Sequence, residues 1–335
     1  MVFRCYSDLA ALPAGCEALF RQAECHSMFL TRPWLENLLA FSAAGETVVL
    51  AGVADGERLL ALLPLRRQAG MLESLRHRYT ALHSLLLAPE AGHEVLDCLA
   101  TGLRGMATDG LLLEPVGAEE ETMSRFQAAL TRQGFVCDRS FRFYNWICPV
   151  TGCYDDYLAA RPAQLRSTIT RKGRKLQRER HGEFRILTGA GVPAGMADYH
   201  RVYRASWKAH EQYHAFLEGL VAAFSAAGWS RLGLLYVDGE PAAAQLWFVV
   251  GGKASIFRLA YDEKWRNYSP GTLLTARMMA HVIDVDGVAE IDFLTGNEGY
   301  KRMWMSQRRE RQALACAPPP VRRRRLGRWF GRQPK

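Results

Sequence analysis

Apolar positions in the first half of the chain alternate between helical and strand spacing. Residues 28–41 place an apolar stripe at helical spacing around Pro33, a residue that suits the first turn of a helix. Residues 46–67 form two apolar runs on either side of Asp55-Gly56, a dipeptide that favours a tight hairpin turn. The alternation continues with a helix over 93–107, a strand over 111–116, a helix over 121–134 and one or two aromatic strands over 135–150.

The second half repeats the alternation more regularly. Three apolar runs over 231–262 are separated by Asp238-Gly239 and Gly251-Gly252, and this spacing predicts a three-stranded antiparallel meander. From Ala313 onward the chain is rich in Pro and Arg, and we expect this end to be disordered. Around the meander the pattern predicts helices over 165–182, 196–211, 216–228, 272–284 and 298–307, and strands over 183–189 and 289–296.

Positive charge is concentrated in two segments. The chain has 335 residues and a formal net charge of +9. Residues 166–180 hold seven Arg or Lys with one acid, and residues 321–335 hold seven with none. The rest of the chain is therefore mildly acidic, which excludes a protein that is basic throughout. In 165–182, Arg171 and Arg174 fall opposite an apolar stripe, so we expect an amphipathic helix whose charges face either solvent or an anion.

Cysteine usage and hydropathy point to the cytoplasm. The eight cysteines form no CxxC pair and no zinc-type cluster, so we expect reduced, buried thiols. No apolar run is long enough to span a bilayer, and the first residues do not resemble a signal peptide. The basic, aromatic segment 321–335 either is a solvated tail or contacts an anionic membrane surface, which would place the protein at the inner membrane face.

Two segments of the second half carry candidate chemistry. The sequence Ser-Pro-Gly at 269–271 opens a helix, where free backbone N–H groups of Gly271, Thr272 and Leu273 favour an anion such as a pyrophosphate. Asp292 lies in an apolar strand and is a candidate base or orienting carboxylate. Lys301 follows it and is a candidate for neutralising a developing oxyanion. The alternative is an ordinary capped helix, a strand-end acid and a surface lysine.

A third segment, 206–214, contains a literal HExxH. Its two histidines, His210 and His214, are spaced as zinc ligands on a helix would be, with Glu211 beside them. The following segment offers no third ligand, so we favour histidines that bind no metal and expect no metal in this protein.

In order along the chain, these motifs resemble the GNAT acyltransferase superfamily, in the branch related to FemAB-type transferases and the CelD/BcsL group of polysaccharide-associated proteins. The matching motifs are the basic helix Arg166 to Leu176, SWK at 206–208, PAAAQ at 241–245, Tyr261-Asp262, SPGTLL at 269–274 and DFLTGNEGYKRMW at 292–304. The resemblance implies an α+β fold, with a mixed and largely antiparallel sheet flanked by helices. It also implies two GNAT-like halves, 1–150 and 151–315, followed by a basic tail, 316–335.

The resemblance further implies an N-acyltransferase that moves an acyl group, typically acetyl from acetyl-CoA, to an amine of a small molecule or glycan precursor. Ser269, Gly271, Thr272 and Leu273 would hold the donor, Asp292 and Lys301 would act in catalysis, and Trp207, Gln245, Tyr261, Arg171 and Arg174 would line the acceptor side. The R/Q-x-x-G-x-G/A signature of many GNAT proteins is absent from this sequence. Two alternatives stay open: an aminoacyl-tRNA-dependent transferase, the one case with a nucleic-acid partner, and a non-catalytic partner of polysaccharide synthesis.

Overall fold

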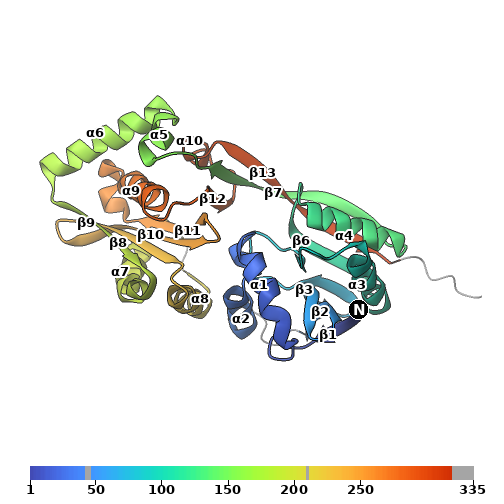
Figure 1. The fold of residues 1–335 in the computed structure, drawn as a ribbon. Helices are drawn as coiled ribbons and strands as arrows, with labels where there is room; N and C mark the ends of the chain where they lie inside the picture. The colour runs from blue at the N-terminus through green and yellow to red at the C-terminus, as the bar shows by residue number, and fades with distance from the viewer. Residues whose placement is uncertain (42–46, 209–210, 319–335) are drawn as a thin grey trace, which may run out of the picture.

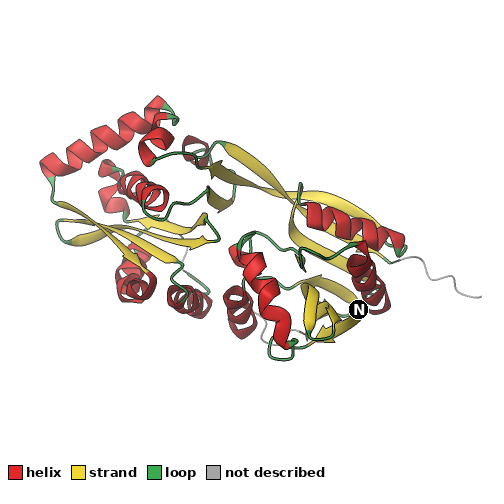
Figure 2. Ribbon diagram, viewed as in Figure 1, coloured by secondary structure: helices red, strands yellow, loops and turns green. Residues whose placement is uncertain are grey.

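A computed structural model describes residues 1–41, 47–208 and 211–318, and within them one mixed sheet runs through the molecule. The order of its strands is β1-β2-β3-β4-β6-β13-β7-β12-β11-β10-β9-β8, with β5 paired to β3. Helices cover both faces of this sheet (Figure 2). We call residues 1–149 the N-terminal half and residues 150–318 the C-terminal half. The predicted α+β class with a largely antiparallel mixed sheet is confirmed.

In its described residues, the N-terminal half contains seven strands and four α-helices. The strands are β1 (Val2–Tyr6), β2 (Thr47–Asp55), β3 (Arg58–Gln68), β4 (Met71–Ser74), β5 (Leu86–Leu87), β6 (Gly110–Gly117) and β7 (Val136–Pro149). The helices are α1 (Glu17–Glu24), α2 (Arg32–Phe41), α3 (His93–Met106) and α4 (Glu121–Arg132). The hairpin predicted around Asp55-Gly56 is confirmed, because β2 and β3 pair antiparallel on either side of it.

The C-terminal half contains six strands and six α-helices in its described residues. The strands are β8 (Gly182–Thr188), β9 (Ser230–Val237), β10 (Glu240–Val250), β11 (Lys253–Tyr261), β12 (Glu290–Thr295) and β13 (Gln307–Ala317). The helices are α5 (Tyr154–Ala159), α6 (Ala163–Glu179), α7 (Val192–Arg204), α8 (His214–Ala226), α9 (Pro270–Asp284) and α10 (Lys301–Trp304). Strands β9, β10 and β11 form the predicted antiparallel meander.

Strand β10 shows how alternation places the core. Its side chains at Leu246 and Phe248 join a hydrophobic cluster with α7, α8 and much of the N-terminal half. Ala243 and Trp247 point to the other face and pack in a second cluster with α9. Because successive side chains of a strand face opposite sides, one apolar strand supplies both cores. This explains why β10 is apolar along nearly its whole length.

The two halves exchange their last long strands. Strand β7 ends the N-terminal half but pairs antiparallel with β12 of the C-terminal half. Strand β13 ends the C-terminal half and lies between β6 and β7, where it pairs antiparallel with both. Figure 1 shows these two strands running together from one half to the other. The sheet is therefore continuous across residue 150, and each half completes the other.

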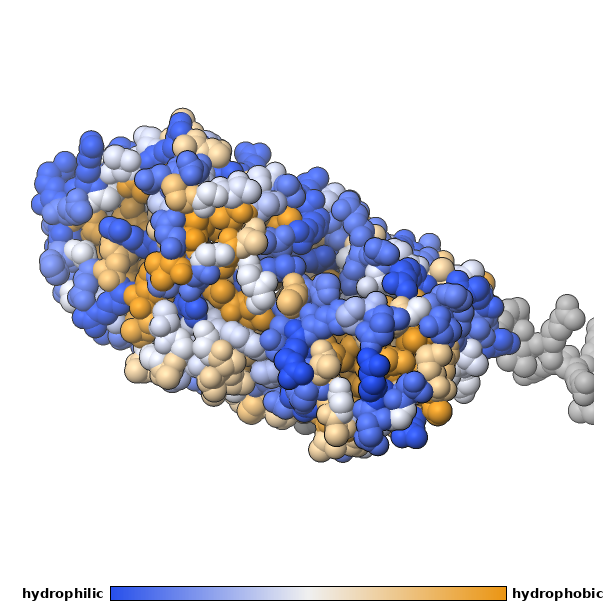
Figure 3. Space-filling view, in the orientation of Figure 1, coloured by the Kyte–Doolittle hydropathy of each residue, from blue (hydrophilic) through white to orange (hydrophobic). Residues whose placement is uncertain are grey.

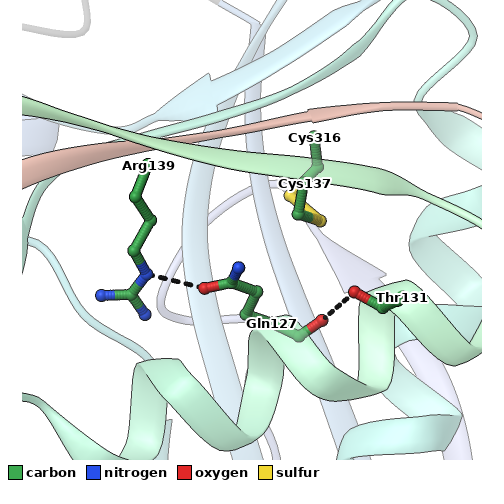
Figure 4. The surroundings of a disulfide bond; sticks show 5 residues. All are labelled: Gln127, Thr131, Cys137, Arg139 and Cys316. Carbon is green, nitrogen blue, oxygen red and sulfur yellow. Dashed lines mark hydrogen bonds between the residues drawn. A yellow bond between two sulfur atoms is a disulfide. The ribbon is translucent and has the colours of Figure 1, made fainter.

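A disulfide joins the exchanged strands. Cys137 of β7 and Cys316 of β13 are direct partners in the antiparallel register and are bonded through their sulfur atoms (Figure 4). Cys5, Cys25 and Cys153 are exposed, whereas Cys16 and Cys148 are buried. The expectation of reduced, buried thiols throughout is therefore wrong. Sequence spacing gave no sign of a pair separated by 179 residues that only the strand exchange brings together.

Three other expectations need correction. Strand β13 runs through Ala317, into the segment expected to be a disordered tail, because its apolar residues pair with strands on both sides. Helix α7 ends at Arg204, so the SWK motif lies outside it. Helix α10 covers only Lys301–Trp304 of the expected helix over 298–307. The segment expected to contact a membrane, 321–335, lies outside the described residues. No helix within the described ranges is long and apolar enough to cross a membrane.

Candidate functional site

The parallel strands β11 and β12 open into a cleft. They pair over only three residues, Lys253 to Ser255 with Glu290 to Asp292, and then separate. Next to this point Phe257 is an extra residue in β11, since Leu246 faces Arg258 while Trp247 faces Ile256 across the sheet. A cavity of about 420 Å³, which we call the cleft pocket, is lined by the separated strands together with Arg78, Tyr79, Glu298, Tyr300 and Lys301.

Helix α9 begins beside this cleft with free backbone donors. The first N–H bonded back along the helix is that of Leu273, to the Ser269 oxygen at 3.1 Å. The N–H groups of Gly271 and Thr272 have no hydrogen-bond partner within the described ranges, and Pro270 has no N–H to offer. Ser269 takes a left-handed conformation, with φ of 54°, which turns the chain into the helix. Free donors at the positive end of a helix dipole suit an anion.

Two aromatic residues stand next to the start of α9. The rings of Trp207 and Tyr261 lie 4.7 Å apart, and Trp207 is exposed. A Cβ atom at Gly271 would come within 3.2 Å of the Tyr261 ring, so glycine allows this close contact. The structure thus brings together Trp207 and Tyr261, predicted for the acceptor, with Gly271, predicted for the donor.

Gln245 holds α9 against the sheet. Its amide nitrogen donates to the Gly271 carbonyl oxygen at 3.1 Å and to the Thr275 hydroxyl at 2.8 Å. Its amide oxygen accepts a bond from the Trp247 indole at 3.0 Å. The side chain is buried and lines neither of the two cavities described for this protein. Gln245, predicted to line the acceptor side, therefore positions α9 in this structure.

The basic helix α6 packs along the start of α9. Gly173 faces Leu273 across the helix pair, where its missing side chain would lie 3.9 Å from a leucine methyl group. Lys172 donates to the Asn267 carbonyl oxygen in the turn before α9. Arg171 and Arg174 are exposed and do not line the cleft pocket. Figure 3 shows the hydrophilic outer edge where α6 lies, next to apolar side chains gathered around α9.

A buried ion pair of the C-terminal half meets Tyr79 of the N-terminal half at the cleft pocket. Arg258 of β11 is paired with Glu211 and also donates to the Tyr79 hydroxyl, while that hydroxyl donates to Glu211. The guanidinium lies 4.5 Å from the centre of the Tyr79 ring. Glu211 is 7% exposed and also accepts the backbone N–H of Tyr213 at 3.0 Å. Tyr79 comes from the N-terminal half, so both halves build this wall.

Lysine side chains supply further charge around the cleft. Lys301 is buried and donates to the carbonyl oxygens of Phe293 and Thr295, and its ammonium lies 3.0 Å from Glu298. Burial lowers the pKa of Lys208 to about 8, the charges of Arg258 and Lys301 act in the same direction, and Glu298 opposes them. Lys208 is therefore partly neutral at mildly alkaline pH.

Asp292 faces away from the cleft pocket. Its carboxylate accepts the Asn145 side-chain amide at 2.5 Å and the Leu294 backbone N–H at 2.6 Å. Burial raises the pKa of Asp292, against the opposing charge of Arg311. It lines a second cavity, of about 480 Å³, while Lys301 lines the first. The structure thus does not bring the two predicted catalytic side chains into one cavity.

Sequence reasoning missed Glu211, Arg258, Tyr79 and Lys208 as site residues. Glu211 did stand out, as the acid of the HExxH pattern, but it binds an arginine here. His214 begins α8, His210 lies outside the described residues, and the described ranges hold no group of side chains suited to a metal. Tyr79 had no local signal, because its role depends on contact between residues 179 positions apart.

Comparisons with known proteins agree with this geometry. Residues 163–302 match the family model described as an acetyltransferase (GNAT) domain. FemX is similar in structure, with a TM-score of 0.62 and 11% identity over 88% of this chain and 94% of that one. A conserved protein of unknown function from Bacteroides thetaiotaomicron gives 0.60 and 12%, over 95% of this chain and 100% of that one.

The C-terminal domain of a putative lysylphosphatidylglycerol synthetase from Agrobacterium fabrum gives a TM-score of 0.57 and 12% identity, over 90% of this chain and 92% of that one. At such identities the likeness shows a shared fold. No curated protein matches the sequence. The family match and the opened strand pair fall in the same part of the chain. Residues 163–302 are therefore similar to an acetyltransferase domain of the GNAT type.

Proposed function

We propose that the protein is an N-acyltransferase that moves an acyl group, acetyl in the simplest case, from acyl-CoA to an amine. The observation that carries this proposal is the opened β11–β12 pair with the free N–H groups of Gly271 and Thr272 beside it. Those two N–H groups suit the donor pyrophosphate. The cleft pocket, between the separated strands, suits the acyl arm. The acceptor is an amine of a small molecule or glycan precursor.

In this reaction the amine nitrogen attacks the thioester carbonyl carbon. The C–S bond breaks, an amide forms, the nitrogen loses one proton and the sulfur leaves as a thiolate. Holding both reactants in place is worth up to ~7–11 kcal/mol in such reactions. The chain's part is therefore to position the reactants, to accept the proton and to stabilise the oxyanion.

We assign the proton acceptor to Lys208. Its lowered pKa, about 8, makes a neutral amine available near physiological pH, as an efficient general base requires. Lys301 and Arg258 place positive charge at the pocket, which favours the oxyanion. Asp292, predicted as base or orienting group, is assigned the orienting role, because its bond to the Leu294 N–H shapes β12 where the strands separate.

A transfer assay with labelled acetyl-CoA and a panel of amines tests this function. We expect labelled amide product and a rise in melting temperature with acyl-CoA, through binding to the native state alone. A chain that binds no CoA ester would contradict an acyl-CoA donor. Binding without transfer to any amine would instead favour a non-catalytic partner of polysaccharide synthesis.

A second candidate is a transferase that uses aminoacyl-tRNA. It is supported by the likeness to FemX over most of both chains and by the exposed basic residues of α6 beside the donor helix. Binding of tRNA would then weaken steeply with salt, because each neutralised phosphate releases counterions. Reversing the charge at Arg171 and Arg174 would abolish that binding, whereas acyl-CoA binding would be unchanged. Parallel titrations with tRNA and acetyl-CoA therefore separate the two donors.

A further inference from the structure

The second cavity, which we call the interdomain pocket, lies between the two halves. It has a volume of about 480 Å³ and is lined by residues of both halves. From the C-terminal half it takes Ser255 and Asp292, which end the paired part of β11 and β12. Leu294 lines both this pocket and the cleft pocket, so the two cavities adjoin along β12. The cavity is large enough for a small organic molecule.

Two charged groups in this pocket have unpaired polar atoms. Arg311 is 8% exposed, and its Nη2 donates to the Asn145 oxygen at 2.8 Å, but its Nε has no partner among the described residues. Glu120 lies directly before α4 and accepts the Ser84 hydroxyl with Oε1. Its buried Oε2 likewise has no hydrogen-bond partner in the described ranges. Buried charged atoms left unpaired are costly, and a bound ligand is one way to satisfy them.

Gly117 lies between Glu120 and Arg311, and its lack of a side chain leaves space between them. A Cβ atom at this position would lie 3.1 Å from Glu120 Oε2 and 3.4 Å from Arg311 Nη1. The carboxylate and the guanidinium thus converge on one point. Part of the remaining lining is charged and includes Lys253, Glu290, Asp292 and Arg309. Another part is apolar and comes from Met28, Phe29, Leu30, Leu82, Leu85 and Leu294. The pocket therefore offers the Glu120 carboxylate and the Arg311 guanidinium side by side, and an apolar wall elsewhere in the same cavity.

We propose that the interdomain pocket binds a free amino acid as its zwitterion. The ligand's ammonium would donate to Glu120 Oε2, and its carboxylate would accept from the Nη1–H of Arg311. A hydrogen bond between a guanidinium and a carboxylate is charge-assisted and roughly twice as strong as a neutral one. The apolar wall would hold the side chain. An ammonium and a carboxylate on neighbouring atoms match two opposite charges that converge on one point.

The same amino acid is suited to be the acyl acceptor, because the two cavities adjoin at Leu294. This role rests on the proposed function, whereas the binding site does not. An acceptor held by its zwitterionic end in the interdomain pocket would present a side-chain amine to the cleft pocket. L-lysine and L-ornithine are the simplest molecules with both features.

Calorimetric titration of the full chain, with no acyl donor present, tests the site. The probes are L-lysine, L-ornithine and L-leucine, with lysine amide, which lacks the carboxylate, and Nα-acetyl-lysine, which lacks the α-ammonium. We expect at least one free amino acid to bind, and both blocked forms of lysine to bind at least tenfold more weakly than lysine. Failure of all three free amino acids, or equal binding of the blocked forms, would overturn the proposal.

Two variants locate the binding in the pocket. Glu120→Gln keeps the shape of the side chain and removes its charge, and Gly117→Ala adds one methyl group at the point where the two charges converge. Each is expected to weaken amino-acid binding at least tenfold, with melting temperature recording that the chain is folded. Unchanged affinity in both folded variants would contradict the site. Binding of lysine without acyl transfer to it would leave the site standing and count against the acceptor role alone.

Discussion

The two halves contain the same parallel strand pair, but only one pair opens into a cleft. In the N-terminal half β4 and β6 pair over three residues, as β11 and β12 do in the C-terminal half. After β11 the chain reaches α9 through the short turn 262–269. After β4 the chain takes the longer path 75–92, which adds β5 to the sheet. In this path the backbone N–H of His83 donates to the Pro115 carbonyl oxygen of β6 at 2.6 Å. The short turn leaves the space between β11 and β12 free, whereas the longer path fills the space between β4 and β6.

The helix that lies between the two strands of each pair in the sequence differs in the charge of its first turn. Helix α3 carries Glu94 in its first turn, and the carboxylate lies within 2.3 Å of the point where a Gly92 Cβ would be. Helix α9 has no acid in its first turn. A carboxylate at a helix N-terminus occupies the place that suits a phosphate and repels a second anion. Both halves thus contain a parallel strand pair, but only the C-terminal half leaves the start of its helix free of a carboxylate.

The N-terminal half, whose strand pair is filled, still contributes residues to the cleft of the C-terminal half. The path 75–92 carries Tyr79 into the cleft pocket, where its hydroxyl meets Arg258 and Glu211. Strand β7 of the N-terminal half likewise lies against β12. The N-terminal half is thus a structural part of the C-terminal site.

The largest expected effect comes from separating the halves. Residues 1–150 and 151–335, expressed as two chains, are each predicted to lack cooperative unfolding, because each lacks a strand that the other half supplies to its sheet. Mixing the two is predicted to restore both cooperative unfolding and acyl-CoA binding. Circular dichroism during thermal unfolding measures this. Cooperative folding of either half alone would show that it does not need the strand supplied by the other half.

Next in size is a charge placed at the open helix. Thr272→Asp puts a carboxylate among the free N–H groups of α9, which stabilises the helix but repels a donor phosphate. A unit charge about 4 Å away costs up to ~4 kcal/mol at a protein surface, so acyl-CoA affinity is expected to fall at least ~100-fold. Fluorescence or calorimetric titration with acetyl-CoA gives the affinity.

Two matched variants control for the shape of the new side chain and for the place of the new charge. Thr272→Asn has nearly the same shape without the charge and is expected to keep most of the affinity. His93→Asp places the same charge at the start of α3, in the filled half, and is expected to leave binding unchanged. Equal loss in the variants at 93 and 272 would show that the halves do not differ as described.

The pH dependence of turnover tests the role assigned to Lys208. Since its pKa is lowered to about 8, the neutral base forms as pH rises, and turnover is predicted to increase through about pH 8 and then level off. Lys208→Met and Lys208→Arg are both expected to lower kcat by ~10²–10⁴, the usual contribution of a general base, since arginine keeps the charge but does not give up its proton. Steady-state kinetics across pH, with acyl-CoA affinity as control, measures this. Full activity of the arginine variant would exclude the role.

The smallest effect concerns the disulfide between the exchanged strands. Cys137→Ser is expected to lower the free energy of unfolding by about 2–4 kcal/mol, since the bond closes a long loop. Cys98→Ser, at a partly buried thiol with no disulfide, is the matched control and is expected to change it much less. Denaturant unfolding of both variants gives the comparison. Equal stability of the two variants would show that the bond does not tie the halves.

Sequence alone predicted what depends on local patterns. The meander, the hairpin at Asp55-Gly56 and the basic helix followed from periodicity and turn residues, and the SPG segment did begin a helix with free N–H groups. Strand β13 was missed because its first residues, QRRER, are charged, although pairing on both sides buries Arg311. The Arg258–Glu211–Tyr79 contact and the filled half could not be predicted, since both depend on residues far apart in sequence.

The most direct test of the central claim is the number of acyl-CoA molecules that one chain binds. Calorimetric titration of the full chain with acetyl-CoA is predicted to give one site per chain. That site should be lost in Thr272→Asp and kept in His93→Asp. Two sites per chain, or one site that Thr272→Asp leaves intact, would contradict the account that only the C-terminal half keeps an open donor cleft.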